Sequence, residues 1–264
     1  MVEGAARAVW VSDAPGQREL LMEFQDDAFV LSARAHGDTG VVVELLTELH
    51  GRHAAYVAGG ASRRMKPFLQ PGARVVADYR ARTSEHLGSA KLEPVGEGPA
   101  ALFDDPLALT GLNAAAAVAQ GSLPEREPHP GAFLAFDALM ASFAFPDIWP
   151  AVFVRFEAGL LEELGFGLDL SKCASTGSAD DLVWVSPRTG RAVSREAGAP
   201  YADKLLPLPP FMLGAQAGLR EGDVKAGLDL TGRFLETFVF HPFNKPLPPA
   251  RVWMLDKLAE AGRL

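Results

Sequence analysis

The chain has 264 residues, of which 48% are hydrophobic and 22% are charged, and its formal net charge is −8. This length predicts two domains or one large one, and the composition is that of a soluble globular protein, which excludes wholesale disorder. No apolar run approaches the ~18–20 residues that span a bilayer, and the acidic balance excludes a protein that coats nucleic acid with its whole surface.

The first 22 residues contain no clear periodic pattern, and we expect them to form an extension. They carry acids and lack the basic and apolar segments of a secretory signal, so we expect a cytoplasmic, nucleoid-associated protein without membrane contact. A single cysteine, Cys173, excludes an internal disulfide and a multi-cysteine zinc site within one chain.

Residues 23–97 alternate short apolar runs with Gly, Pro and polar turns, which predicts strands. The five expected strands span residues 28–35, 40–47, 53–58, 73–82 and 87–93. This number of strands, with an excursion between the third and fourth, is typical of an OB-fold barrel. An SH3-like barrel is the competing interpretation, and strand counting does not separate the two.

Residues 98–264 are predicted to form an all-α domain with an irregular insert at about 168–200. Asp104-Asp105-Pro106 is typical of a helix start, because acids favour the positive end of the helix dipole and proline fits the first turn. Gly165 is expected to end the third helix. The expected helices span residues 107–120, 132–145, 148–164, 223–240 and 250–261. The predicted fold is therefore α+β and multidomain.

A search for reactive groups finds no phosphate loop, no dinucleotide-binding glycine motif and no nucleophile elbow. Two acid pairs, Asp104-Asp105 and Asp180-Asp181, could hold a divalent cation, but such pairs beside Pro, Gly and Ser are more often caps or turns. The spacing of His50 and His53 permits a metal role, although a solvated or DNA-facing pair is the better interpretation. We expect no enzyme, no cofactor and no bound metal.

The strongest chemical signal is a concentration of positive charge. Between residues 52 and 82, seven Lys and Arg residues accompany a single acid, Asp78, in a chain that is acidic overall. Arg63, Arg64 and Lys66 follow the flexible pair Gly59-Gly60. Such a barrel matches single-strand binders, in which a cationic groove follows the phosphates. The candidate DNA-binding residues are Arg34, Arg52, Arg63, Arg64, Lys66, Arg74, Arg80, Arg82 and Lys91.

The alternative to this interpretation is a solvated barrel surface with scattered arginines. Arg80 and Arg82, two positions apart on a predicted strand, should share one face, with Tyr79 and Ala81 on the other. Of the nearby aromatic residues, Phe68 is expected in the barrel core. For Tyr56, base stacking and core packing both remain open.

Several short motifs resemble the RecO family in order and spacing. In the barrel they are His36-Gly-Asp-Thr39, His50-Gly-Arg52, Gly59-Gly-x-x-Arg-Arg64 and Pro67-x-x-Gln-Pro-Gly72. In the second domain they are Arg155-Phe-Glu157 to Leu164-Gly165, Phe166 to Cys173, and Ser186 to Ala197. The resemblance extends from about Gln25 to the last residue.

This resemblance implies an OB-fold followed by a helical domain, and a role in DNA repair and homologous recombination. It implies binding to single- and double-stranded DNA, annealing of complementary strands, and work with RecR to load RecA onto DNA coated with the single-strand binding protein SSB. It also implies recognition of the acidic C-terminal tail of SSB.

One departure concerns zinc. Many members of the family carry two Cys-x-x-Cys pairs in the insert, and the corresponding positions here are Cys173, Thr176, Val193 and Glu196. One thiolate and one carboxylate do not complete a tetrahedral structural site. We therefore expect a metal-free insert held by the packing of residues such as Val183, Trp184, Val185 and Tyr201.

The leading hypothesis is thus a recombination mediator whose cations neutralise phosphates. A rival is a non-catalytic adaptor whose barrel binds acidic protein tails rather than DNA, through paired hydrogen bonds to arginine. A third is a metal-dependent nuclease that uses Asp180 and Asp181.

Overall fold

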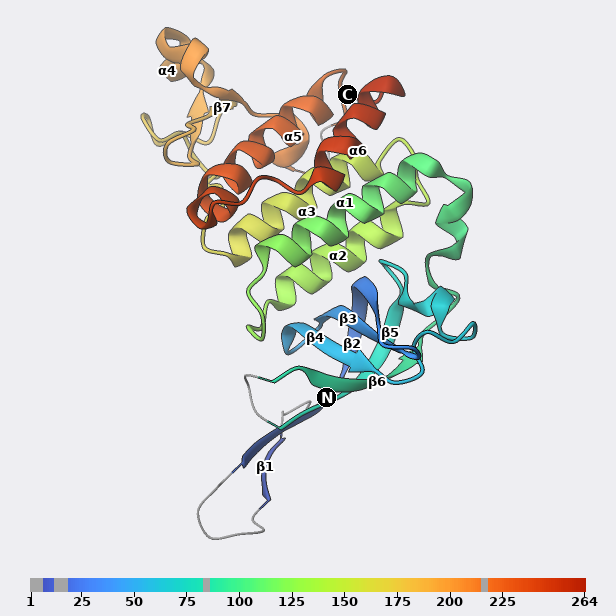
Figure 1. Cartoon of the computed structure of the whole chain (residues 1–264). Coiled ribbons are helices and arrows are strands. Elements are labelled where there is room, and N and C mark those ends of the chain that lie inside the picture. The colour runs from blue at the N-terminus through green and yellow to red at the C-terminus, as the bar shows by residue number, and fades with distance from the viewer. Residues whose placement is uncertain (1–6, 12–18, 83–85, 215–217) are drawn as a thin grey trace. The chain divides into compact units, whose positions relative to one another are not determined.

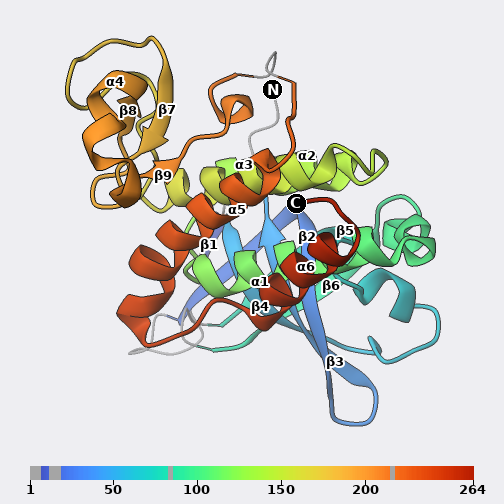
Figure 2. The ribbon, with the colours of Figure 1, turned by 90° about the horizontal axis from the view of Figure 1, so that it is seen from above.

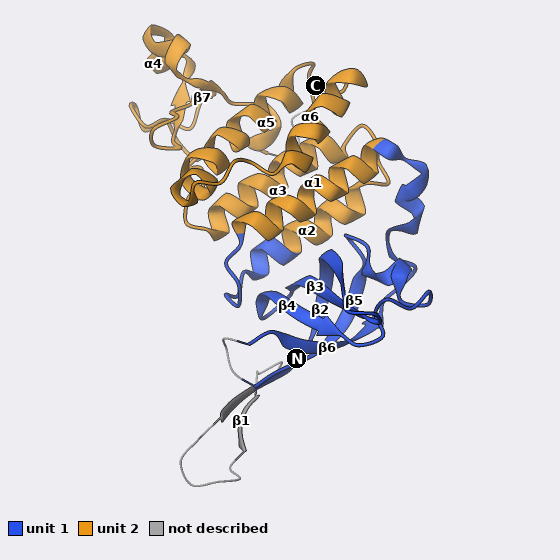
Figure 3. Cartoon of the chain, in the orientation of Figure 1, with its two compact units in different colours: residues 1–106, 123–133 blue, residues 107–122, 134–264 orange. Residues whose placement is uncertain are grey.

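The computed structural model describes residues 7–11, 19–82, 86–214 and 218–264, and it divides into two compact units (Figure 3). Unit 1 comprises Met1–Pro106 and Leu123–Phe133, and unit 2 comprises Leu107–Ser122 and Leu134–Leu264. The segment Leu123–Phe133 groups with the strands because Arg52 Nε donates to Leu123 O at 3.0 Å and Arg126 N donates to Arg52 O at 2.7 Å. The sequence predicted a domain boundary at residue 98.

Unit 1 is a closed five-stranded barrel, as predicted (Figure 1). Its strands are β2 (Glu19–His36), β3 (Gly40–Thr47), β4 (Gly51–Val57), β5 (Arg74–Ala81) and β6 (Gly88–Pro94). The order around the barrel is β2-β3-β4-β6-β5, β4 pairs in parallel with β6, and β5 returns to β2. This strand order is that of an OB-fold and resolves the alternative of an SH3-like barrel.

The long strand β2 closes the barrel. Its first half pairs with β5 from Met22 to Phe29, and its second half pairs with β3 from Ala28 to His36. A register shift between Val30 and Ser32 lets one strand serve two neighbours, because a bulge bends and twists the strand that contains it. The strand β1 (Arg7–Val11) pairs with the start of β2, in a segment where the sequence predicted no regular element.

The barrel interior follows the alternation of apolar residues along the strands. In β4, positions 51, 53, 55 and 57 are buried and the residues between them are partly exposed. In β5, Val75, Ala77, Tyr79 and Ala81 point inward, so Arg80 lies on the outer side, as predicted; Arg82 follows the end of β5 and is exposed.

Unit 2 is helical. Its main helices are α1 (Pro106–Ser122), α2 (Pro130–Ser142, whose first turn belongs to unit 1), α3 (Trp149–Glu163), α5 (Asp223–Phe234) and α6 (Pro249–Glu260). α5 continues as a π-helix over Leu235–Phe240. Short 3-10 helices span Lys66–Leu69 (η1), Gly98–Asp104 (η2), Ala199–Lys204 (η3), Pro210–Met212 (η4) and His241–Phe243 (η6). No helix in the described ranges is long and apolar enough to cross a membrane.

Two glycines of unit 2, Gly165 and Gly111, allow a helix end and a close helix contact. Gly165 ends α3 with φ +82°, and Phe166 N donates to Leu161 O at 2.7 Å, which is the expected glycine cap. Trp149 packs against Gly111, where a Cβ atom would lie 2.7 Å from the indole ring.

The insert forms a small lobe with α4 (Arg195–Gly198) and the strands β7 (Leu182–Val185), β8 (Ala192–Ser194) and β9 (Leu206–Pro207) (Figure 2). β7 is the central strand and pairs with both others in antiparallel fashion. The region expected to be an irregular insert therefore contains the hairpin β7–β8.

Candidate nucleic-acid interface

The excursion between β4 and β5 presents three of the predicted cations to solvent. Arg63, Arg64 and Lys66 are exposed, and none of them forms an ion pair with any residue that the structure describes. The excursion is fixed at both ends, because Ala61 N donates to Thr39 O at 3.1 Å and Gly72 N donates to Val30 O at 2.8 Å. The cations are therefore displayed on an anchored segment.

A groove of about 440 Å³ lies between this excursion and the β2–β3 hairpin. Lys66 and Arg34 contribute its positive charge, and Arg34 is exposed near the end of β2. The remaining lining is small, apolar or uncharged: Ser32, Ala33, Ala35, Val41, Gly60, Ala61, Leu69, Gln70 and Pro71. A groove with cations but no lining carboxylate is suited to a polyanion. We call Arg34, Arg63, Arg64 and Lys66 the unpaired cations.

Three other predicted arginines are engaged by carboxylates of the barrel itself, and two of them are held by close ion pairs. Arg52 Nη1 lies 2.6 Å from Glu44 Oε2 with both side chains mostly buried. Arg74 Nη2 lies 2.9 Å from Asp27 Oδ2. These two guanidiniums are held in place by carboxylates of neighbouring strands.

Arg80 and Lys91 lie on the outer side of the β2–β5–β6 sheet, which carries charges of both signs. Arg80 Nε is 3.6 Å from Glu23 Oε1 and 3.5 Å from Asp78 Oδ1. Lys91 is the cross-strand neighbour of Asp78, and Arg82 is exposed directly after β5. Glu23 comes from the neighbouring strand β2, so the sequence count over residues 52–82 did not include it.

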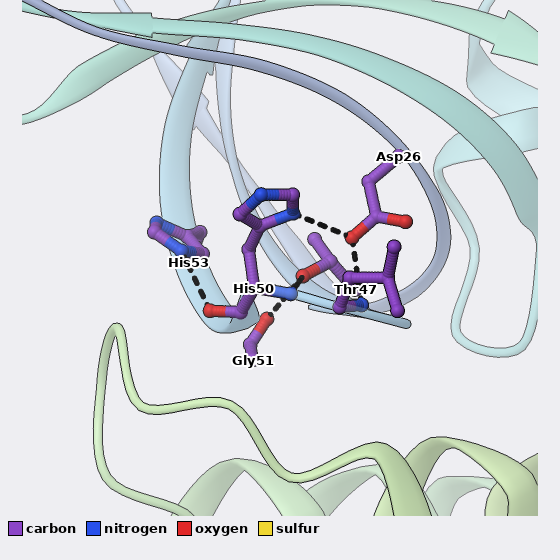
Figure 4. A network of polar contacts seen from close by, with 6 residues as sticks. Asp26, Thr47, His50, Gly51 and His53 are labelled. Carbon is purple, nitrogen blue, oxygen red and sulfur yellow. Dashed lines mark hydrogen bonds and ion pairs between the residues drawn. The ribbon is translucent and has the colours of Figure 1, made fainter. Parts of the chain in front are cut away.

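His50 and His53 belong to a polar network inside unit 1 (Figure 4). His50 Nδ1 lies 2.8 Å from Asp26 Oδ2, and His53 Nε2 bonds His50 O at 3.0 Å. His53 is only 2% exposed, and Phe24 stacks on His50 with ring centroids 4.0 Å apart. The expectation of a solvated or DNA-facing histidine pair is therefore wrong, because the alternation of β4 turns position 53 inward.

Burial lowers the pKa of His53 from 6.5 to about 4, against the raising effect of its hydrogen bond to His50 O. Tyr79 is fully buried beside His53, and burial raises the pKa of the Tyr79 hydroxyl, which also favours the neutral form of that group. Both groups are thus kept neutral at pH 7 and contribute no charge to a phosphate site.

Phe68 and Tyr56, the two aromatic residues considered for core packing or base stacking, lie in different environments. Phe68 is partly exposed, and its neighbour Leu69, 5% exposed, enters the barrel core instead, which corrects the expectation for Phe68. Tyr56 is partly buried on the outer side of β4, and its ring contacts His36 at a centroid distance of 5.8 Å. The core of unit 1 does not include Tyr56.

The positions that correspond to a zinc site hold a hydrogen-bonded cluster around a buried sulfur. Ser194 N and Ser194 Oγ donate to Cys173 Sγ at 3.3 and 3.4 Å. Val193 is buried beside them, whereas Thr176 and Glu196 are exposed. In the described residues, no three His, Cys, Asp or Glu side chains are grouped for a metal.

Val185 is fully buried in the insert, and Trp184 packs against Gly198, as expected for this small core. Tyr201 is 59% exposed and is not part of it, because η3 carries this side chain to the surface. Asp181 pairs with Arg195 at 3.1 Å, and Asp180 accepts a hydrogen bond from Ser178 Oγ at 3.2 Å. These two acids have the turn role that the sequence favoured over cation binding.

Fold and groove define the class of the protein: an OB-fold barrel with a cationic groove, joined in one chain to a helical unit. The chain matches the family descriptions "Recombination protein O N terminal" over residues 22–95 and "Recombination protein O C terminal" over residues 104–247. Together these matches cover most of the chain.

Curated relatives agree with this assignment. A "DNA repair protein RecO" of Phenylobacterium zucineum is 76% identical over 243 residues, which are 92% of this chain and 100% of the relative. One from Caulobacter sp. strain K31 is 74% identical with the same coverage, and one from Rhodospirillum centenum is 50% identical over 91% of this chain and 96% of the relative. The chain belongs to the RecO family of DNA repair proteins.

Proposed function

We propose that this chain binds single- and double-stranded DNA through the unpaired cations and promotes the annealing of complementary strands. The observation that carries the proposal is the cationic groove between β2 and the β4–β5 excursion, whose Arg and Lys residues have no carboxylate partner among the described residues. Free cations release counterions from phosphates on binding, whereas cations already in ion pairs gain little.

Neutralisation of phosphates by these cations explains the proposed annealing activity. Two DNA strands repel each other through their phosphates, and a surface that neutralises one strand lowers the barrier to pairing with the other. With RecR, such a protein helps to load RecA onto SSB-coated DNA. The function requires no nucleotide hydrolysis, and we assign no catalytic residue. Arg82 and Lys91 remain part of the proposed interface as a second, weaker surface.

A second candidate function is the binding of an acidic protein tail, such as the C-terminal tail of SSB, in the same groove. The groove is favourable for this ligand because apolar Ala33, Val41 and Leu69 line it together with Arg34 and Lys66. Titration of a labelled single-stranded oligonucleotide at two salt concentrations separates the candidates, since an adaptor alone shows little affinity for DNA.

The decisive experiment compares strand annealing of SSB-coated DNA by the wild type and by the triple variant Arg63→Ala, Arg64→Ala, Lys66→Ala. We expect slower annealing, and a slope of log K against log salt reduced by ~0.7 to ~0.9 for each phosphate that the variant no longer neutralises. The matched control replaces Arg191, Arg195 and Lys225, three paired cations of unit 2, with alanine and so makes the same charge change. Unchanged DNA binding in the Arg63, Arg64 and Lys66 variant removes this surface as the interface.

A further inference from the structure

The outer side of β2, β3 and β4 brings a cation and an aromatic ring into one row. Arg34 is the cross-strand neighbour of Val42, and Val42 is in turn the neighbour of Tyr56. Side chains at paired positions lie on the same side of a sheet. Neighbouring strands lie about 4.8 Å apart, so the Cα atoms of Arg34 and Tyr56 are about 10 Å apart, with Val42 between them.

The ring of Tyr56 is seated on a glycine. A Cβ atom at Gly40 would lie 2.2 Å from Tyr56 Cε2 and 2.4 Å from the hydroxyl oxygen, so the ring rests against the bare backbone of position 40. His36, the cross-strand neighbour of Gly40, meets the same ring edge-on with an interplanar angle of 75°. The backbone and His36 together fix the ring before any ligand arrives, which lowers the entropic cost of binding.

Tyr56 differs in this respect from the aromatic residues of the barrel core. Phe24 and Tyr79 stack on each other with centroids 4.8 Å apart and are 7% and 0% exposed. Tyr56 is partly exposed and His36 is exposed. The ring face turned away from Gly40 is therefore the one that a planar ligand can reach.

The segments next to this aromatic pair carry two cations, Arg63 and Arg64, and one exposed acid, Asp38, in the turn after His36. Ala61 N bonds Thr39 O at 3.1 Å, which ties the excursion carrying Arg63 and Arg64 to the turn that follows His36. Glu44, the acid on the same side of β3, is already paired with Arg52. The excursion that carries Arg63 and Arg64 is thus bonded to the turn beside the aromatic pair.

We infer that Tyr56, supported by Gly40 and His36, is a stacking platform for one base of a single-stranded nucleic acid whose phosphates contact the unpaired cations. This inference rests on the proposed function and adds the side chain that contacts a base, which requires an unpaired strand with accessible bases. In a duplex the base faces are already stacked and unavailable. β3 and β4 are the second and third strands of the barrel, the face on which OB-folds bind oligonucleotides, and base stacking on aromatic side chains is tolerant of sequence.

The test uses two labelled oligomers of equal length, oligothymidylate and the same backbone with every base replaced by an abasic residue. Fluorescence anisotropy gives both affinities for the wild type, Tyr56→Leu, Tyr56→Phe and the control Tyr201→Leu, which removes an exposed tyrosine of unit 2. We expect Tyr56→Leu to weaken binding to oligothymidylate about 5- to 150-fold, the range for one stacked base. Its binding to the abasic oligomer should stay at the wild-type value. Tyr56→Phe and Tyr201→Leu should behave as the wild type on both.

Two results overturn the platform: an unchanged affinity for oligothymidylate in Tyr56→Leu, or an equal loss on both oligomers, which would mark a structural role. The cation variant Arg63→Ala, Arg64→Ala, Lys66→Ala distinguishes the two proposals, because it should weaken both oligomers alike. If the cation variant binds both oligomers as tightly as the wild type does, the proposed interface is wrong. If it binds both more weakly, and Tyr56→Leu keeps the wild-type ratio of the two affinities, only the platform is wrong.

A second measurement does not depend on the folding of a variant. An oligothymidylate that contains 5-iododeoxyuridine is irradiated with the wild-type protein, and the crosslinked peptide is identified by mass spectrometry. We expect the adduct at Tyr56. Adducts that leave Tyr56 unmodified overturn the inference.

Discussion

Arg251 and Glu157, 94 positions apart in the chain, form a two-pronged ion pair inside the helical unit. Arg251 Nε lies 2.5 Å from Glu157 Oε1 and Arg251 Nη2 lies 2.9 Å from Glu157 Oε2, with the Glu157 side chain fully buried. Thr231 Oγ1 also donates to Glu157, and Arg251 donates to Leu228 O, so the pair joins α3, α5 and α6. Neither residue lines the groove of unit 1, so we test the pair by its effect on stability.

Replacing one partner should be costly. Glu157→Gln leaves the guanidinium of Arg251 buried without its counter-charge, and we expect a loss of about 3–5 kcal/mol in the free energy of unfolding. Urea denaturation measures it. The control is Asp229→Asn, which breaks the exposed pair with Lys225 and should cost at most about 1 kcal/mol. Equal effects of the two substitutions would contradict the buried pair.

His53 should make the barrel sensitive to acid. Its folded pKa of about 4 lies below the unfolded value of 6.5, so the unfolded chain binds the proton first. The stabilising contribution is complete above pH 6.5 and is lost as the pH falls toward 4, a change of about 3 kcal/mol. We expect His53→Gln to abolish this part of the pH dependence in urea titrations, while His241→Gln, at an exposed position, retains it. A wild-type profile in His53→Gln would show that other groups cause the acid sensitivity.

We expect Arg52 to contribute to the stability of the protein and not to its affinity for DNA. Arg52→Ala removes the ion pair with Glu44 and the hydrogen bond to Leu123 O, and we expect a loss of about 1–3 kcal/mol in the free energy of unfolding. The salt dependence of oligonucleotide binding should stay at the wild-type slope. A slope reduced by ~0.7 to ~0.9 would instead show that Arg52 binds a phosphate.

The insert should hold no structural zinc. Cys173 is the chain's one cysteine, and Ser194 already donates two hydrogen bonds to its sulfur. We expect atomic absorption of the purified protein to find no stoichiometric zinc, and incubation with EDTA to leave the Tm unchanged. One tightly held zinc per chain would contradict this prediction.

Sequence patterns predicted the strands and helices well because those signals are local. The alternation of apolar residues in β4 and β5, and the Pro and Gly residues at Pro106 and Gly165, act within a few positions of the chain. The same alternation turned Arg80 to the outer side of β5, as predicted. Tyr201 was misjudged because local composition does not tell which side chain of a short turn reaches the surface.

By itself the sequence determined a small barrel of five strands, a helical second domain, an excess of cations between residues 52 and 82, and the likeness to RecO. Only the tertiary structure decided which cations remain free. Arg52, Arg74 and Arg80 meet carboxylates of Glu44, Asp27 and Glu23, all on other strands of the barrel. It also decided the OB topology, through the parallel pairing of β4 with β6. The physical reason is the same in each case: the charge of an arginine is written in the sequence, but its electrostatic effect depends on partners that only strand pairing brings within ion-pair distance.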